Sequence, residues 1–249
     1  MVTHLGRYMS EKAEISDEFK AFDESLIQNT EILVMIFKLI MSYIGNKEPD
    51  KDKLRQLSID ELRELDENVI IWLRGYEHAR LLRWLLGVTI TSSVDAFEYY
   101  LSQILLKVFT KRPDIFRASE YKAEVREFIE AGSLPEFMKR FAEKRVNELS
   151  YMGLSKIIGY LNNRLGLGFD IMDSSFQAAC ELIEVRNILA HNVGRVNKLF
   201  LQRTGRTDLH EGDLYPLTFE YLRDKSIELA RFTEKLDRMI TSHFRLNQE

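Results

Sequence analysis

Three polar side chains interrupt an otherwise apolar run in the C-terminal third of the chain. Arg186, Asn187 and His191 lie within the segment Glu184-Val-Arg-Asn-Ile-Leu-Ala-His-Asn192. Placing polar groups in an apolar setting costs free energy unless they have partners or a task. Histidine exchanges protons near neutral pH, and arginine presents planar, charged donors that match phosphate oxygens. These residue types therefore favour acid–base chemistry beside an anionic group.

On a helix, the three polar side chains fall on one side. A helix turns by about 100° per residue, which places Arg186, Asn187 and His191 within an arc of about 140°. The small side chain of Ala190 lies in the same arc and leaves room for a ligand. Because the rise from Arg186 to His191 is about 7.5 Å, within one chain they line a groove rather than share a hydrogen bond. Two symmetric copies could bring more such groups together.

The helix that carries this motif has start and stop signals in the sequence. Asp173, Ser174 and Gln177 form a capping-box pattern that begins a helix. Asn192 and Gly194 are residue types that end one. The motif is therefore predicted to lie at the C-terminal end of its helix.

A basic segment begins in the motif and continues beyond it. Residues 185–207 contain no Asp or Glu, although the net charge of the whole chain is -4. A polyanion would therefore have to bind at a local cluster of positive charges rather than to the molecule as a whole. The cations that follow the motif either hold neighbouring phosphates or are solvated surface charges. They are Arg195, Lys198, Arg203 and Arg206.

The composition predicts an all-α protein. Hydrophobic residues make up 45% of the 249 residues, whereas only 12 are glycine and 4 are proline. Apolar residues recur at helical spacing along most of the chain, so we expect a bundle of long antiparallel helices. A helix over residues 92–109 carries Asp95 and Glu98 beside its apolar stripe. These two acids are either solvated charges or partners for a buried cation on another helix.

The chain divides into two predicted parts, an N-terminal helical segment (residues 1–57) and a helical domain (residues 58–249). The first contains a heptad-like helix over residues 16–44, which either packs antiparallel in its own bundle or is shared between protomers. Ser58 and Glu61 form a capping box that would begin the second part. The heptad positions are Phe19, Leu26, Leu33 and Ile40.

Several classes of protein are disfavoured. A single cysteine, Cys180, excludes an internal disulfide framework and a cysteine-rich zinc site. The most apolar run, residues 32–44, is shorter than the roughly 20 residues that span a bilayer, and no secretory signal is evident at the N-terminus. No carboxylate-rich metal cage is evident near the motif. We expect a cytoplasmic protein with no membrane span, no metal and no cofactor.

The pattern Arg186-Asn187-x-x-x-His191, near a helix end, resembles the signature of the higher eukaryote and prokaryote nucleotide-binding (HEPN) superfamily. Members are α-helical bundles whose signature is an arginine, often followed by a polar residue, and a histidine after four to six intervening residues. The resemblance covers about residues 88–243, including the helix that carries Asp95 and Glu98. The N-terminal segment carries no recognisable signature.

The resemblance implies a metal-independent endoribonuclease, often a toxin or an effector of phage defence, whose two motifs meet across a homodimer. His191 would be the general acid or base for attack of a ribose 2′-OH on its phosphate, and Arg186 would stabilise the charge of the phosphorane. Asn187 would orient the substrate or the histidine. The products would carry 2′,3′-cyclic phosphate and 5′-OH ends. The supporting residues would be Asp95, Glu98, Glu184 and Asn192.

One departure from the superfamily concerns regulation. Toxins that are controlled by a nucleotidyltransferase often have a tyrosine two residues after the histidine, where this chain has Val193. An inhibitor or antitoxin of another kind is therefore the expectation. The alternative to catalysis is a helical module that binds nucleotide, RNA or a protein partner. In that case Arg186 and His191 would cap helix carbonyls or pair with Asp95, Glu98 or Glu184.

Overall fold

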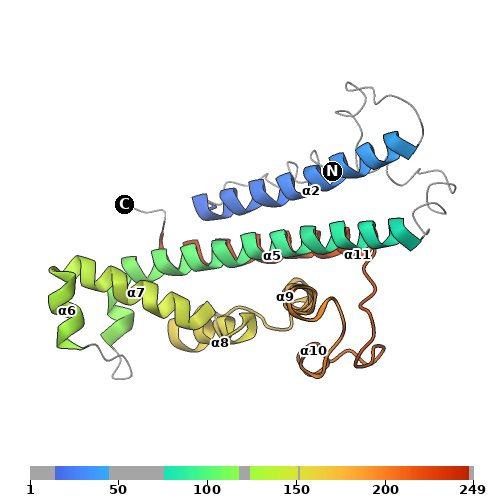
Figure 1. Ribbon diagram of the computed structural model, residues 1–249. Coiled ribbons are helices and arrows are strands. Elements are labelled where there is room, and N and C mark those ends of the chain that lie inside the picture. Colours follow the sequence, from blue (N-terminus) through green and yellow to red (C-terminus); the bar gives the residue numbers. More distant parts are fainter. Residues whose placement is uncertain (1–14, 45–75, 118–123, 151, 247–249) are drawn as a thin grey trace. The chain divides into compact units, whose positions relative to one another are not determined.

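The computed structural model describes residues 15–44, 76–117, 124–150 and 152–246, and within them the elements of regular secondary structure are all helices (Figure 1). Within these ranges the only extended pairing is an isolated antiparallel bridge between Arg195 and Leu214. The prediction of an all-α protein is confirmed. The helices are α2 (Asp17–Ile44), α5 (Tyr76–Lys111), the 3-10 helix η2 (Pro113–Arg117), α6 (Val125–Ala131), α7 (Leu134–Ser150), α8 (Leu154–Leu165), α9 (Ser174–Asn192), α10 (Lys198–Thr204) and α11 (Phe219–Phe244).

Local sequence signals account for several helix ends. The hydroxyl of Ser16 accepts a hydrogen bond from the Phe19 amide at 3.0 Å and caps α2, where the heptad pattern predicts a helix. Proline lacks the N–H that would continue α5, and Pro113 lies two residues beyond the last residue of that helix, Lys111. Gly132 takes a left-handed conformation, with φ of 72°, between α6 and α7. The predicted boundary at residue 57 and the Ser58 capping box lie outside the described residues.

The chain forms two compact units, and each is described by itself. The first, here called the motif unit, contains Asp23–Val94 and Leu182–Ser226. The second, here called the aromatic unit, contains Ala13–Phe22, Asp95–Glu181 and Ile227–Glu249. The limits of the units fall inside α2, α5, α9 and α11. Each of these four helices therefore contributes residues to both units.

Phenylalanine and tyrosine rings build the core of the aromatic unit. The ring of Phe97 lies 6.3 Å from Phe22 and 5.8 Å from Phe232, between centroids. Phe232 in turn contacts Phe169 and Phe176 at 5.4 and 5.6 Å. All five rings are buried. These contacts fix the beginning of α2, the second half of α5 and most of α11 around one aromatic cluster.

A buried carboxylate, Asp237 on α11, connects three segments of the aromatic unit. It accepts hydrogen bonds from the Ser16 amide at 2.8 Å, from the Ser16 hydroxyl and from the Tyr100 hydroxyl at 3.2 Å. Burial raises the pKa of Asp237 above its ordinary value, although these hydrogen bonds oppose the shift. Burial and the nearby Asp237 raise the pKa of Tyr100 as well. Ser16 thus caps α2 and also attaches its first turn to α11.

The heptad helix α2 has a polar contact inside the motif unit. Asn29 lies within the predicted heptad-like helix, and its side-chain oxygen accepts a hydrogen bond from the Ser92 hydroxyl of α5 at 2.9 Å. The amide oxygen therefore has a partner within the same chain. No helix among the described residues is long and apolar enough to cross a membrane.

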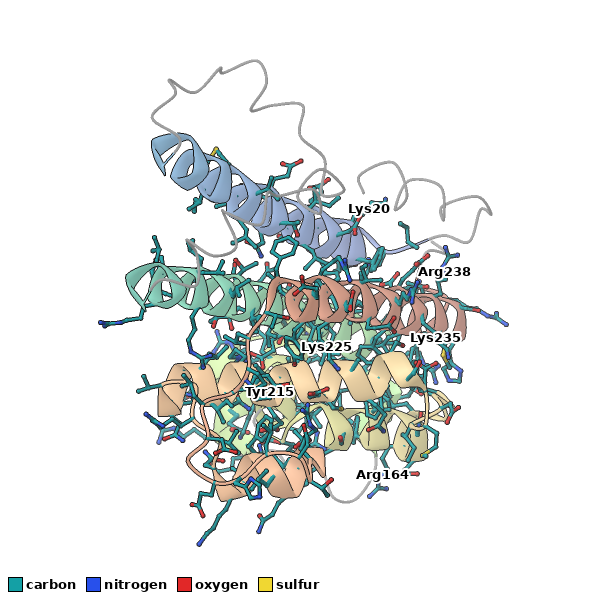
Figure 2. The ribbon with its side chains drawn as sticks, turned by 90° about the vertical axis from the view of Figure 1, so that its right-hand side faces the viewer. Lys20, Arg164, Tyr215, Lys225, Lys235 and Arg238 are labelled. Carbon is teal, nitrogen blue, oxygen red and sulfur yellow. The ribbon has the colours of Figure 1, made fainter. Side chains whose placement is uncertain are left out.

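Asp173 begins α9, as the capping pattern predicts. One carboxylate oxygen accepts hydrogen bonds from the amides of Ser175 and Phe176 at 3.0 and 3.3 Å. The other pairs with Lys235, which projects from α11 and is labelled in Figure 2. Hydrogen bonds from Lys235 and Ser175 lower the pKa of Asp173 to about 2. The start of the motif-bearing helix is therefore fixed by a charged cap.

Replacing Asp173 with Asn should destabilise the protein in a pH-dependent way. Because the pKa of about 2 in the folded state lies below the ordinary 3.8, the carboxylate stabilises the fold above about pH 4, and this contribution is lost as the pH falls towards 2. Urea unfolding should show a loss of about 2 kcal/mol at pH 7 and about half of that at pH 3. Asp224→Asn, at an exposed ion pair, should change stability by less than about 0.5 kcal/mol. An equal loss for Asp173→Asn at both pH values would contradict the charged cap.

Candidate active site in the motif unit

The C-terminal half of α9 is held in the motif unit by its apolar side. Val185 and Ile188 are buried in the core. Leu189 packs against Gly87 of α5, where a Cβ atom on the glycine would lie 3.7 Å from the Leu189 side chain. α5 continues through Gly87 without a break, and this glycine instead allows Leu189 to approach α5 closely. The opposite side of α9 carries the motif.

The three motif side chains become more exposed towards the end of the helix. Arg186 and Asn187 are half-buried, and the Nε atom of Arg186 is fully buried. His191 is exposed, as is Ala190 beside it. The imidazole of His191 is accessible to a ligand from solvent, whereas the side chain of Arg186 is less exposed. The helix end therefore carries an acid–base group at the surface and a cation that is closer to the core.

Glu184 connects the motif helix to α10. Its carboxylate accepts a hydrogen bond from the Asn187 amide at 3.4 Å and pairs with Arg203 at 3.0 Å. α10 lies beside α9 (Figure 1). Of the four predicted supporting residues, Glu184 directly contacts a motif side chain. Through that contact it restricts the orientation of Asn187.

The chain turns sharply after the motif. Val193 and Gly194 both have positive φ, 53° and 71°, a conformation that a β-branched residue adopts only at a cost. The Gly194 amide donates to the Ile188 carbonyl at 2.8 Å, and the Asn192 side chain donates to the Arg195 carbonyl at 2.7 Å. Asn192 therefore supports the backbone of the turn. This turn sets where the helix ends and hence where His191 lies.

Arg83, on α5, forms hydrogen bonds to the turn after the motif. Its Nη1 donates to the Tyr215 carbonyl at 2.6 Å and its Nη2 to the Gly194 carbonyl at 3.4 Å. Tyr215, which is labelled in Figure 2, is buried, and its amide donates to the same Gly194 carbonyl at 2.9 Å. Burial, and secondarily the charge of Arg195, lowers the pKa of Arg83. One guanidinium thus joins α5, the turn after the motif and the segment that leads to α11.

The segment after the turn is paired with residues 212–215. The amide of Val196 donates to the Asp213 carbonyl at 2.8 Å, and the amide of Gly212 donates back to Val196 at 2.9 Å. Together with the bridge between Arg195 and Leu214, these bonds give the loop before α11 a defined backbone. The sequence predicts only a loop over residues 205–216, because an isolated bridge is too short to leave a period-2 pattern.

Most of the basic segment has acidic partners in the folded chain. Arg203 pairs with Glu184, Arg206 with Asp208 at 2.6 Å, and Lys198 approaches Glu211 at 3.9 Å. The hydrogen bonds from Arg206 lower the pKa of Asp208 to about 2. Arg195 differs from these three cations because its Nη1 donates to the Gly212 carbonyl at 2.9 Å. The segment is free of acids in sequence, yet acids from outside it neutralise most of its charge.

The other two predicted supporting residues are not part of the motif unit. Asp95 and Glu98 are exposed side chains of α5 and belong to the aromatic unit. Among the residues that the structure describes, no three His, Cys, Asp or Glu side chains are grouped so that they could hold a metal ion. The site consists of the motif, Glu184, Asn192 and the residues that shape the turn.

Arg83 is the residue that sequence reasoning missed. It lies in the run Leu81-Leu-Arg-Trp-Leu-Leu86, where a single charge among apolar residues is as unusual as the motif itself. Charged residues are almost never fully buried without a partner. That signal could have identified Arg83, although not the carbonyl groups that it contacts.

Replacing Gly194 with Ala should destabilise the protein more than the same change at Gly205. Both glycines have positive φ, 71° and 66°, but a Cβ at Gly194 would lie 2.6 Å from Arg83 Nη2, whereas one at Gly205 has no atom within 4 Å. We expect about 1 kcal/mol from backbone strain at Gly205 and about 2 to 3 kcal/mol at Gly194, where the arginine must also move. Urea unfolding of both variants measures the difference. Equal losses would show that the contact with Arg83 does not constrain the turn.

Comparisons with known proteins add no family to this picture. No protein-family model, no curated protein and no solved structure matches the chain. The function proposed below therefore depends on the motif and on the geometry of the helix that carries it.

Proposed function

We propose that this protein is a metal-independent endoribonuclease of the HEPN type. The observation that carries the proposal is the exposure of His191 on the same helix as the half-buried Arg186 and Asn187, at a helix end fixed by a hydrogen-bonded turn. Such a site offers a proton-transfer group to a substrate from solvent and places a permanent cation nearby. RNA is the substrate class because the 2′-OH supplies the nucleophile.

The mechanism assigns one role to each motif residue. The ribose 2′-oxygen attacks the adjacent phosphorus while a general base removes its proton, and the bond to the 5′-oxygen breaks as that oxygen receives a proton. His191 takes part in one of these proton transfers. Arg186 stabilises the negative charge of the phosphorane. Asn187, restrained by Glu184, orients the substrate, and the products are a 2′,3′-cyclic phosphate and a 5′-OH.

A homodimer would complete the site. The rise of about 7.5 Å between Arg186 and His191 separates these residues along a single helix. A second copy that presents its motif to the first would place its Arg186 beside the His191 of this chain and its His191 beside the Arg186 of this chain. We therefore propose a composite active site that takes residues from two chains.

The biological setting that follows is a toxin or an effector of phage defence, acting on RNA in the cytoplasm. Such an enzyme needs an inhibitor or antitoxin to protect its own cell. Val193 is exposed over 86% of its surface and carries no hydroxyl for modification. Restraint by nucleotide transfer to a tyrosine at this position is therefore not available, and we propose a binding inhibitor instead.

A noncatalytic binding module is the second candidate function, and one observation favours it. Arg203, Arg206 and Lys198 have acidic neighbours in the folded chain, which reduces the charge that would hold a long polyanion. Exposed ion pairs are weak, at about 0 to 1 kcal/mol, so phosphates could still displace these acids. The two candidates differ in whether His191 is needed for chemistry.

Purified protein should cleave single-stranded RNA in the presence of a chelator, and His191→Ala should lower the cleavage rate by about 10² to 10⁴-fold, as expected for loss of a general acid or base. The matched control is His210→Ala, which removes another exposed imidazole of the motif unit. It should cleave at the wild-type rate. Gel analysis of the products should show cyclic phosphate ends. Equal cleavage by His191→Ala and wild type would reject the enzyme assignment.

The composite site predicts that two inactive variants restore activity when they are mixed. Arg186→Ala and His191→Ala chains, refolded together, would form heterodimers with one intact site, and random pairing should recover about a quarter of wild-type cleavage. Light scattering should show a dimer for each variant alone and for the mixture. If dimers form but the mixture stays inactive, each site uses residues of a single chain.

A further inference from the structure

Two arginines flank the short backbone pairing that follows the motif. Arg195 is itself a bridge residue opposite Leu214, and its side chain donates to the Gly212 carbonyl at 2.9 Å. Arg83 reaches the same pairing from α5 and donates to the carbonyls of Tyr215 and Gly194. Both guanidinium groups are therefore anchored to the same two short stretches of chain, at residues 194–196 and 212–215.

The two arginines also differ from their neighbours in what they contact. Among the described residues, all of the hydrogen bonds of Arg83 and Arg195 go to carbonyl oxygens, and neither forms an ion pair with a carboxylate. The nearby charge of Arg195 contributes to the lowered pKa of Arg83, so the two cations repel each other. An anion between or beside them would remove that cost.

The backbone beneath the arginines is well supported. Tyr215 is buried, and its ring makes edge contacts with Phe200 and Tyr221, each at 5.5 Å between centroids. A guanidinium has five N–H groups, of which the Arg195 side chain directs one to a protein acceptor. The remaining donors can meet the oxygens of a ligand. A rigid base with uncommitted donors reduces the ordering cost of binding.

We propose that Arg83 and Arg195 form a phosphate-binding site for the RNA backbone next to the motif. The choice of RNA as ligand rests on the proposed function, whereas the site itself follows from the two arginines and their bridge. Arg195 lies four residues after His191, and its carbonyl accepts the Asn192 side chain at 2.7 Å. The site thus binds a phosphate neighbouring the one that is cleaved and positions the strand across His191.

The salt dependence of RNA binding tests this site. In a His191→Ala background, a fluorescent single-stranded RNA oligonucleotide is titrated at several salt concentrations. Each phosphate contact removed from a single strand should reduce the slope of log Kd against log salt by about 0.7. We expect that reduction for Arg195→Gln and about twice as much for the Arg83→Gln, Arg195→Gln double variant.

The matched control is Arg140→Gln, because Arg140 is an exposed arginine of the aromatic unit that is paired with Glu136. Its slope should equal that of the parent. Because Arg83→Gln removes a buried contact, thermal unfolding checks that the double variant is folded. If the double variant does not fold, the Arg195→Gln variant by itself tests the site. An unchanged slope for Arg195→Gln would overturn the site.

The outcomes separate this site from the proposed reaction. Cleavage by wild type together with an unchanged Arg195→Gln slope would reject the phosphate site and leave the ribonuclease assignment intact. Reduced slopes without any cleavage by wild type would support the site and reject the enzyme. A parent protein that binds neither the RNA nor the matching single-stranded DNA would overturn the phosphate site.

Discussion

A guanidinium in the motif unit, that of Arg83, determines how the chain leaves the motif helix. The carbonyls that it contacts belong to Gly194 and Tyr215, which are far from α5 in sequence. A half-buried cation is tolerated only when oxygen atoms surround it, so the turn after His191 and the segment before α11 must both lie against α5. The exposed position of the histidine follows from that arrangement, because the turn ends α9 directly after it.

The aromatic unit depends on a charge of opposite sign in a comparable way. Asp237 is buried and accepts hydrogen bonds from Ser16 and Tyr100, and without those donors its carboxylate would cost several kcal/mol. The surrounding aromatic rings provide nonspecific hydrophobic stabilisation, which permits many arrangements of similar helices. The buried polar contacts select one of them. Each unit therefore combines apolar packing with one polar node that specifies how its segments meet.

Folding also changes the charge environment of the basic segment. Residues 185–207 contain no acid, yet the acids of residues 184, 208 and 211 lie beside three of its cations. Arg195, in contrast, bonds a carbonyl, as does Arg83 of α5. These two cations are therefore the ones to which we assign the proposed phosphate site.

The sequence by itself determined the helical class, the cap at Asp173 and the position of the motif at a helix end. These features depend on periodicity and on residues within one or two turns, so they can be read locally. Only the tertiary structure decided that Glu184 pairs with Arg203, that Asp95 and Glu98 belong to the other compact unit, and that Arg83 supports the turn. Such contacts join residues that are distant in sequence or on different helices, and their formation depends on which apolar faces pack together. The spacing of residues in the sequence does not indicate which apolar faces pack together.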